Sequence, residues 1–360
     1  MKFLDLFAGI GGFRLGMESA GHECIGFCEI DKFARASYKA IHDTKGEIEL
    51  HDITRVTDES IRRIGRVDAI CGGFPCQAFS IAGNRRGFED TRGTLFFEIA
   101  RFASILRPQY LFLENVKGLL NHENGITFET IISTLDELGY DVEWQVLNSK
   151  DFGVPQNRER VFIIGHFRGE CTRRIFPLSV QSQSISNKSV VKIGNVNPSG
   201  NGMNGEVYQA DGLAPTLTTN KGEGQKIAIK SNTIKQFGVL QPNFNQCGVV
   251  YETDGIAPTI RAYQGGGLEP KIIQRGHGYN QGGVHEIAPT LTSNSYHENN
   301  HLSFSYRIRK LTPRECWRLQ GFPDWAFDKA QEVNSNSQLY KQAGNSVTVN
   351  VIAAIAKELE

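Results

Sequence analysis

The chain has 360 residues, of which 39% are hydrophobic and 22% are charged, and its 39 Lys and Arg residues balance 39 Asp and Glu residues. These values are typical of a soluble globular protein, and the length is sufficient for two domains. Because the formal net charge is zero, whole-chain charge neither supports nor excludes a nucleic-acid partner.

The cysteines and the apolar segments exclude further classes of protein. The seven cysteines are scattered and include no Cys-x-x-Cys pair, which indicates a reducing environment and no structural zinc site. The chain begins Met-Lys-Phe-Leu-Asp, without the leader of a secreted protein. No stretch approaches the roughly 18 apolar residues of a membrane-spanning helix. We therefore expect a cytoplasmic protein that binds no metal and no membrane.

The first 170 residues alternate short apolar runs with helical patterns, which predicts a mostly parallel sheet covered by helices on both faces. We expect strands at 2–6, 23–29, 69–72, 110–114, 142–148 and 161–166. Helices lie between them, for example at 94–106 and 128–138. Near the end of the chain one apolar face predicts a helix that packs back on the first domain, formed by Val347, Val351, Ile352, Ile355 and Leu359.

The first predicted strand runs into a glycine-rich turn that enters a helix. Gly9 and Gly11 fit the dinucleotide-binding fingerprint, but Arg14 occupies the position of its third glycine. The helix N-terminus suits a pyrophosphate, and the close backbone approach equally suits a different adenosine-bearing cofactor. Glu29, at the end of the second strand, is placed to bind ribose hydroxyls; the alternative is an exposed carboxylate at a strand end.

Two further strand ends carry side chains of chemically reactive types. Cys76 follows Gly72 and Gly73, which we expect to let the backbone leave the sheet, and Pro75, which stiffens the turn. Cys76 is then either a nucleophile at the sheet edge or a small buried hydrophobic residue. Glu114 ends another strand, where it is either a proton donor in the same crevice or a structural carboxylate.

Residues 175–305 differ from the rest, with 17 Gly and 13 Asn and few long helical patterns. We predict a loop-rich, mainly β domain there, inserted into a catalytic domain formed by 1–174 and 306–360. The insert carries an Ala-Pro-Thr repeat in three copies, at 212–217, 255–260 and 286–291. The copies are either a duplicated β-hairpin scaffold or duplicated recognition units.

An ordered set of motifs spans nearly the whole chain. The set comprises Asp5-Leu-Phe-Ala-Gly-Ile-Gly-Gly12, Gly73-Phe-Pro-Cys-Gln77, Arg92-Gly-Thr94, Glu114-Asn-Val116, Gln156-Asn-Arg-Glu-Arg160, Arg314-Glu-Cys316, Gln320-Gly-Phe-Pro323 and Gly344-Asn-Ser-Val347. Together they resemble the DNA cytosine-5 methyltransferase family, in particular its bacterial and phage restriction-modification type. The resemblance implies an α/β, Rossmann-like domain that uses S-adenosylmethionine, with a small inserted target-recognition domain. It further implies methylation of carbon 5 of a flipped-out cytosine within a specific sequence of duplex DNA, through a covalent cysteine adduct.

The resemblance also assigns roles to residues. Cys76 would attack carbon 6 of the cytosine, Glu114 would protonate ring nitrogen 3, and Arg160, with Arg158, would stabilise the adduct from the oxygen side. Phe7 would stack on the adenine and Glu29 would hold the ribose. The implied cofactor-binding residues are Phe7, Gly9, Ile10, Gly11, Gly12, Glu29, Ile30, Asp52, Ile53, Pro75, Leu95 and Asn345. His51 precedes Asp52 where the family usually has glycine.

The implied DNA-binding residues lie in three places. Residues 77–92 resemble the mobile catalytic loop of the family, which would bring Ser80 and Arg85 to DNA. The insert has nine basic and eight acidic residues, so its Asn, Gln and Gly are better suited to base edges than to phosphates. Gln246 and Gln281 are the candidates there. Phosphate contacts would come from a basic cluster formed by Arg307, Arg309, Lys310, Arg314 and Arg318.

The resemblance predicts a bacterial or phage-encoded monomer that acts on double-stranded DNA, with a cognate restriction endonuclease as a possible partner. Three alternatives stay open. An RNA (tRNA) cytosine-5 methyltransferase on the same scaffold is disfavoured by the repetitive insert. A catalytically silent DNA-binding relative is disfavoured by the presence of Cys76, Glu114 and Arg160, and a nicotinamide oxidoreductase by Arg14.

Overall fold

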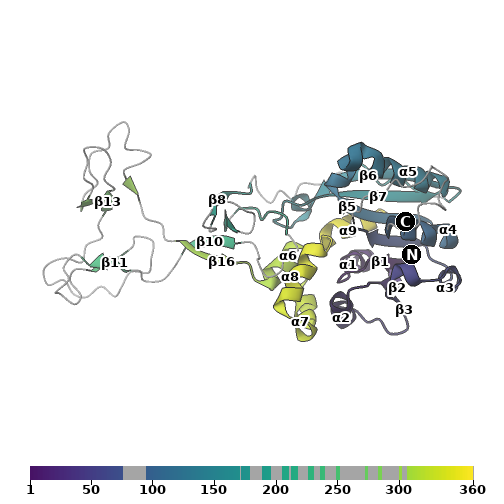
Figure 1. The fold of residues 1–360 in the computed structure, drawn as a ribbon, viewed down its shortest axis with the longest axis horizontal. Helices are drawn as coiled ribbons and strands as arrows, with labels where there is room; N and C mark the ends of the chain where they lie inside the picture. Colours follow the sequence, from purple (N-terminus) through teal and green to yellow (C-terminus); the bar gives the residue numbers. More distant parts are fainter. Residues whose placement is uncertain are drawn as a thin grey trace. The chain divides into compact units, whose positions relative to one another are not determined.

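The computed structural model describes residues 1–75, 95–170, 172–178, 189–195, 205–210, 212–217, 226–230, 236–239, 249–251, 272–274, 283–285, 300–301 and 306–359. Its elements are shown in Figure 1. The chain divides into two compact units. The first comprises Met1–Gln225 and Lys310–Glu360, and the second comprises Lys226–Arg309.

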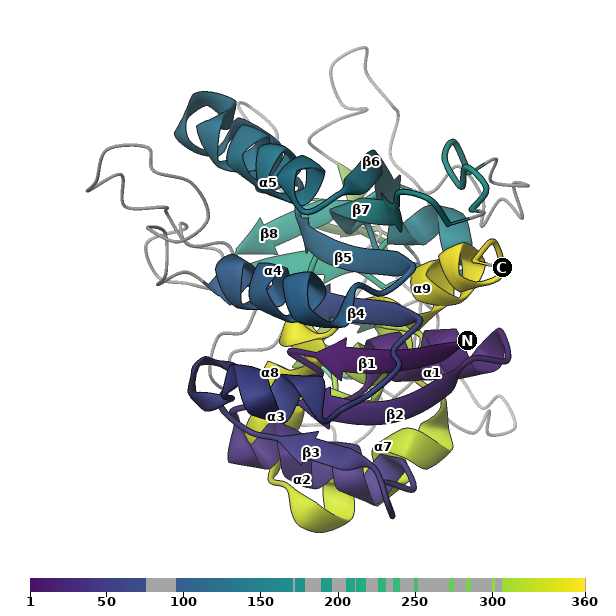
Figure 2. The ribbon, with the colours of Figure 1, turned by 90° about the vertical axis from the view of Figure 1, so that its right-hand side faces the viewer.

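A seven-stranded sheet in the order β3-β2-β1-β4-β5-β7-β6 forms the centre of the first unit (Figure 2). Its strands are β1 (Lys2–Leu6), β2 (Glu23–Cys28), β3 (Ile48–Leu50), β4 (Ala69–Gly73), β5 (Tyr110–Val116), β6 (Tyr140–Asn148) and β7 (Glu159–Phe167). Strands β1 to β5 pair in parallel, whereas β7 is antiparallel to both β5 and β6. The predicted mostly parallel sheet is therefore confirmed.

Helices and short 3₁₀ segments connect these strands and follow them. They are α1 (Gly12–Ser19), α2 (Lys32–Ile41), η1 (Ile53–Arg55), α3 (Asp58–Arg62), α4 (Leu95–Leu106), η2 (Lys117–Gly125), α5 (Ile126–Glu137), η3 (Ser149–Phe152), α6 (Pro313–Leu319), α7 (Asp324–Val333), α8 (Asn336–Asn345) and α9 (Val349–Ala356). Capping side chains explain where two of the helices begin. Asp31 caps α2 by accepting from the amide of Phe33, and Thr312 and Glu315 form a capping box at α6.

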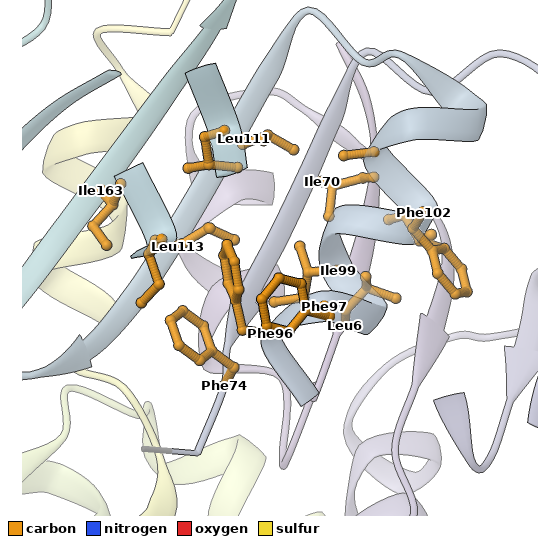
Figure 3. Close-up of a cluster of buried hydrophobic side chains, with 14 of the residues drawn as sticks. Leu6, Ile70, Phe74, Phe96, Phe97, Ile99, Phe102, Leu111, Leu113 and Ile163 are labelled. Carbon is orange, nitrogen blue, oxygen red and sulfur yellow. The ribbon is translucent and has the colours of Figure 1, made fainter. Parts of the chain in front are cut away.

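Because successive side chains of a strand point to opposite faces of the sheet, the hydrophobic core is divided between the two faces. Leu4 and Leu6 of β1 and Leu111 and Leu113 of β5 lie in one cluster with apolar side chains of α4 and α5. Figure 3 shows part of this cluster, with Phe96, Phe97, Ile99 and Phe102 of α4 beside the sheet residues. Each of these α4 side chains is buried, so α4 is fixed over the centre of the sheet.

The opposite face of the sheet packs against α1 and α9, and Figure 2 shows these two helices across the sheet from α4 and α5. A Cβ atom at Gly16 of α1 would lie 2.5 Å from Cγ2 of Ile352, so the two helices approach more closely than a larger residue allows. Val351, Ile352 and Ile355 of α9 are buried there. The predicted return of the last helix to the first domain is confirmed.

The inserted segment contains short strands in both units. They are β8 (Lys192–Asn195) and β9 (Glu206–Gln209) in the first unit, and β10 (Lys226–Lys230), β11 (Gln236–Val239), β12 (Val249–Tyr251), β13 (Ile272–Gln274), β14 (Gly283–His285), β15 (Asn300–His301) and β16 (Tyr306–Lys310), of which β10 to β15 lie within the second. The pairs β8 with β9, β11 with β12, and β13 with β14 are antiparallel. None of the helices in the described ranges has the length and apolar content that a membrane crossing requires.

The first repeat copy is hydrogen-bonded to the segment that precedes β7. Ala214 donates its amide to the carbonyl of Pro155 at 2.9 Å and accepts from the amide of Asn157 at 2.9 Å. Thr216 adds a hydroxyl hydrogen bond of 2.8 Å to the Asn157 carbonyl. The first repeat copy therefore belongs to the first compact unit, whose first segment ends at Gln225, whereas the sequence predicts the boundary at 174. The division into a catalytic and a target-recognition domain stays a prediction.

Candidate active site

Four strand ends bring the predicted site residues to one edge of the sheet. The order of strands reverses between β1 and β4, and open α/β sheets bind ligands outside the carboxyl ends of the strands at such a point. Leu6 pairs in register with Cys28 and with Gly72, and Gly73 pairs with Glu114. The residues that follow these pairs therefore leave the sheet side by side.

The turn after β1 has a backbone that depends on its glycines. Gly9 has φ +57° and Gly11, the N-cap of α1, has φ +85°, which are values that side-chain-bearing residues rarely adopt. Phe7 also has a positive φ of 56°, an unusual conformation for an aromatic residue. A Cβ atom at Gly12 would lie 2.7 Å from Cγ2 of Val347, so the segment before α9 packs directly on this turn.

Arg14 explains why the turn departs from the dinucleotide fingerprint. Its guanidinium bonds both carboxylate oxygens of Glu47, at 2.8 and 2.7 Å, and Nε bonds Glu18 at 2.8 Å. The Arg14 side chain is almost fully buried, and its Cζ lies 5.5 Å from the centre of the Tyr38 ring. The position that the fingerprint gives to glycine is thus part of an ion-pair cluster between α1 and the loop that precedes β3.

Glu29 ties this turn to the end of β2. Its Oε2 accepts from the Gly9 amide at 2.8 Å, and its Oε1 accepts from the Asp31 amide at 2.7 Å. Burial raises the pKa of Glu29, although both amide hydrogen bonds oppose the rise. Each oxygen retains a second lone pair for a hydroxyl donor. The next residue, Ile30, exposes 68% of its surface and offers an apolar face beside this carboxylate.

Asp52 and Ile53 have structural partners of their own. Asp52 caps η1, because Oδ1 accepts from the hydroxyl of Thr54 at 2.7 Å and from its amide at 3.1 Å, and these bonds lower the pKa of Asp52. Ile53 is buried in the core, and its carbonyl accepts from Arg101. Any contact of Ile53 with a ligand would therefore be made by its backbone.

Glu114 and Arg160 form an ion pair at the carboxyl end of β5. Nε of Arg160 lies 2.9 Å from Oε1 of Glu114, and the two side chains are 16% and 10% exposed. Burial raises the pKa of Glu114, and the charges of Arg160 and Arg158 counteract this rise. A carboxyl with a raised pKa keeps its proton closer to neutral pH, so Glu114 is suited to donate a proton at this edge.

Gly72 and Gly73 correct one expectation from the sequence. They do not turn the chain out of the sheet, because β4 continues through Gly73 and neither residue has a positive φ. A Cβ atom at Gly72 would lie 2.9 Å from the carbonyl oxygen of Leu6, and one at Gly73 would lie 3.1 Å from Oε2 of Glu114. The two glycines make room for β1 and for the Glu114 carboxylate.

Comparison with known proteins agrees with this arrangement. The model of the C-5 cytosine-specific DNA methylase family matches residues 1–360. The chain belongs to this family. It is 36% identical to the orphan methyltransferase M.SPRI of Bacillus phage SPR, covering 100% of this chain and 97% of that one. It is also 36% identical to the type II methyltransferase M.HhaI of Haemophilus parahaemolyticus, covering 99% and 93%. The identity with M.HpaII of Haemophilus parainfluenzae is 38%, covering 99% and 88%.

Solved structures show the same fold. The S. pombe Dnmt2 methyltransferase superposes with a TM-score of 0.58 at 19% sequence identity, covering 98% of this chain and 96% of that one. A putative DNA modification methyltransferase encoded within an E. coli prophage gives a TM-score of 0.51 at 20% identity, covering 99% and 98%. At these identities the likeness concerns the fold alone.

The C-5 cytosine methyltransferase family uses S-adenosylmethionine as methyl donor, and the edge of the sheet fits this cofactor. A carboxylate oriented by two backbone amides suits ribose hydroxyls, and the exposed Ile30 suits the face of an adenine. The glycine turn allows the rest of the cofactor to approach the backbone closely. Within the described part of the chain, no group of three His, Cys, Asp or Glu side chains is arranged to hold a metal ion.

Several predicted residues lie at the site, and others lie outside the described residues. Pro75 is exposed two residues after β4, Leu95 begins α4, and Asn345 is exposed at the end of α8. Arg309 lies in β16 and its side chain is outside the described set. The predicted residues that lie wholly outside the described residues are Cys76, Ser80, Arg85, Gln246 and Gln281.

Two amide side chains, which the motifs alone do not explain, fix backbone segments near the site. Nδ2 of Asn115 donates to the carbonyl of Phe74 at 2.9 Å and so fixes the backbone two residues before Cys76. Gln320 bonds the Ala343 carbonyl at 2.9 Å and the Thr348 hydroxyl at 3.0 Å. Both lie in quoted motifs, but an amide side chain in a sequence does not reveal which distant backbone group it binds.

The basic cluster is partly engaged within the protein. Arg318 forms a two-point ion pair with Asp324, with bonds of 2.7 and 2.6 Å. Arg314 pairs with Asp328, and its Cζ lies 4.5 Å from the centre of the Phe327 ring. Both arginines therefore join α6 to α7, and their phosphate contacts stay a prediction.

Proposed function

We propose that this DNA (cytosine-5-)-methyltransferase transfers the methyl group to carbon 5 of a flipped-out cytosine through a covalent adduct with Cys76. The observation that carries the proposal is the buried pair of Glu114 and Arg160, which lies beside the strand that leads into Cys76. In register, Glu114 is the neighbour of Gly73, three residues before the thiol. A proton donor, a cation and a nucleophile thus come from adjacent strand ends.

The reaction requires a nucleophile because carbon 5 of cytosine is itself poorly nucleophilic. The Cys76 thiolate adds to carbon 6, and electron density then reaches carbon 5. When bound, S-adenosylmethionine supplies an electrophilic methyl group. After transfer, the carbon 5 proton is lost and the Cys76 sulfur leaves carbon 6. Since neither carbon is accessible in a stacked duplex, the base has to leave the helix first.

Glu114 acts on the opposite side of the base. Its raised pKa favours the protonated carboxyl, which donates to ring nitrogen 3 and stabilises the electron density gained on attack. Once Glu114 has given its proton to the base, Arg160 pairs with the resulting carboxylate, and it also stabilises the adduct at the cytosine oxygen. Asn115 fixes the backbone that presents Cys76.

The cofactor residues follow from the turn and the strand ends. Glu29 would hold the ribose, and Phe7, Ile30, Asp52 and the Ile53 backbone would surround the adenine. The remaining contacts would come from Gly9, Ile10, Gly11, Gly12, Pro75, Leu95 and Asn345. The fixed carboxylate of Glu29 and the packing of Gly12 against Val347 support this placement.

Target recognition is assigned to residues 175–305. Gln246 and Gln281 would read base edges or fill the gap left by the flipped base, while Ser80, Arg85 and Arg309 would contact DNA near the site. Deleting residues 232–270 should change the set of methylated sequences, and an unchanged set would contradict a role of the middle repeat copy. We further propose that the enzyme acts as a monomer, and that a restriction endonuclease, where one accompanies it, acts on the same site.

Methylation of defined substrates tests the function. Purified enzyme is incubated with S-adenosylmethionine and either duplex DNA or tRNA, and bisulfite sequencing locates the modified cytosines. We expect methylated DNA at a short recurring sequence, unmodified RNA, and no product with Cys76→Ser. Methylation of RNA alone would contradict the proposed substrate, and full activity of Cys76→Ser would contradict the proposed nucleophile.

A further inference from the structure

Arg158 lies at the junction of the cytosine side and the cofactor side of the site. It immediately precedes β7, and its side chain is only 3% exposed. Its backbone is held by the end of β6, because the Arg158 amide donates to Oδ1 of Asn148 at 3.1 Å and its carbonyl accepts from the Ser149 amide at 3.0 Å. The backbone from which the Arg158 side chain extends is therefore fixed.

The guanidinium of Arg158 binds the segment between α8 and α9. Its Nη2 donates to the carbonyl of Ser346 at 2.8 Å and to that of Gly344 at 3.3 Å. These two carbonyls flank Asn345, which is exposed. A charged donor shared by two carbonyls that lie two residues apart fixes this segment more firmly than a neutral contact does.

The same segment forms a wall of the cofactor turn. A Cβ atom at Gly12 would lie 2.7 Å from the Val347 side chain and 2.9 Å from Oγ of Ser346. The segment is bound a second time just beyond Val347, where the Thr348 hydroxyl lies 2.8 Å from that of Ser149. Residues 344–348 are thus held between the glycine turn and the adjoining ends of β6 and β7.

The other nitrogens of Arg158, Nε and Nη1, are buried and make no hydrogen bond within the described part of the chain. Burial, together with the nearby charge of Arg160, lowers the pKa of Arg158 to about 9. In contrast, Arg160 is the arginine that contacts Glu114, at 2.9 Å. The two arginines of the motif therefore have different partners.

We infer that Arg158 is a positioning residue that sets the affinity for the cofactor by tethering residues 344–347 to the start of β7, rather than a group that contacts the cytosine. This inference rests on the proposed function. It assigns the two arginines to separate steps: Arg158 acts on cofactor binding, and Arg160 acts on methyl transfer. A lysine at 158 retains a cationic donor for the same carbonyls, so Arg158→Lys should rescue much of what Arg158→Ala loses.

Binding and turnover are measured separately on the full chain. Titration calorimetry with S-adenosylhomocysteine should show binding weakened about 10- to 100-fold in Arg158→Ala and less than about 10-fold in Arg158→Lys. KM for S-adenosylmethionine should rise in parallel, while kcat at saturating cofactor stays within a few-fold. Arg160→Lys should show the reverse: a large loss of kcat with little change in the binding of S-adenosylhomocysteine. Arg168→Ala, a surface arginine that follows β7 and pairs with Asp136 and Asp141, should change neither quantity.

Two results would overturn the inference. The first is unchanged binding of S-adenosylhomocysteine by Arg158→Ala together with a large loss of kcat, which would place Arg158 on the cytosine. The second is a loss of kcat at saturating cofactor in Arg158→Lys as large as in Arg160→Lys, which is decisive even where Arg158→Ala does not fold. Wild-type protein that neither binds S-adenosylhomocysteine nor methylates DNA would instead contradict the proposed function itself.

Discussion

Replacing Arg160 with methionine removes the cation beside Glu114 while retaining much of the side-chain volume. In the native protein Nε of Arg160 lies 2.9 Å from the carboxylate, and both side chains are largely buried. Burial already raises the pKa of Glu114 above its ordinary value of 4.5, and Arg160 opposes that rise. Without Arg160 the pKa of Glu114 must therefore rise further.

The expected loss of stability in Arg160→Met follows from leaving the buried Glu114 charge without its partner, which costs about 3 to 5 kcal/mol when the charge is retained. A group whose pKa is higher in the folded than in the unfolded protein makes its full contribution to the free energy of unfolding below the unfolded pKa. That contribution is lost as pH rises through the folded pKa. Arg160→Met should thus lower the free energy of unfolding by about 3 kcal/mol near pH 8 and by much less near pH 5. Urea denaturation at the two pH values measures both quantities.

Glu114→Gln supplies the matched control, because the amide occupies the same space and cannot ionise. In that background, the effect of Arg160→Met should be nearly the same at both pH values. An equal loss of stability near pH 5 and pH 8 with Glu114 present would refute the reasoning. So would a pH dependence that persists in the double variant, since the effect would then arise elsewhere.

Three further changes have expected outcomes. Gly16→Ala should destabilise by about 1 to 3 kcal/mol in thermal or urea denaturation despite better helix propensity, because its Cβ would lie 2.5 Å from Ile352. Gly11→Ala should weaken binding of S-adenosylhomocysteine by calorimetry, because its Cβ would lie 2.1 Å from Nε2 of His42, whereas Gly21→Ala, with a similar positive φ and open space, should leave that binding unchanged. The pKa of buried His42 is lowered from 6.5 to about 3, so its stabilising contribution is present above pH 6.5 and is lost as pH falls towards 3. At pH 5 the loss is about 2 kcal/mol, and His42→Phe should remove it from the pH profile of stability.

The fold could be predicted where local pattern and tertiary packing coincide. The strand at 2–6 is observed with these bounds, because Leu4 and Leu6 face one core and Phe3 faces the other. The apolar face of the last helix also indicated its packing correctly. The three-residue strand β3 was not predicted, since Ile48–Leu50 is too short to show a period.

The site could be predicted only as a set of residue types at strand ends. The pairing of Glu114 with Arg160 depends on the antiparallel register of β5 and β7, which no local pattern encodes. The interpretation of Gly72 and Gly73 as a turn was wrong, because their conformation is extended and the reason for glycine is the proximity of Leu6 and Glu114. The carbonyl partners of Arg158 lie more than 180 residues away in the chain, so its tethering role required the structure.

The central claim is that Cys76 forms a covalent bond to carbon 6 of the target cytosine. Duplex DNA with 5-fluorocytosine at the methylated position tests it most directly, because fluorine cannot leave as a proton does and the adduct persists. After incubation with S-adenosylmethionine, peptide mass spectrometry should find the DNA attached to Cys76. Attachment to another residue, or turnover of normal DNA without any trapped adduct on the fluorinated duplex, would contradict the account.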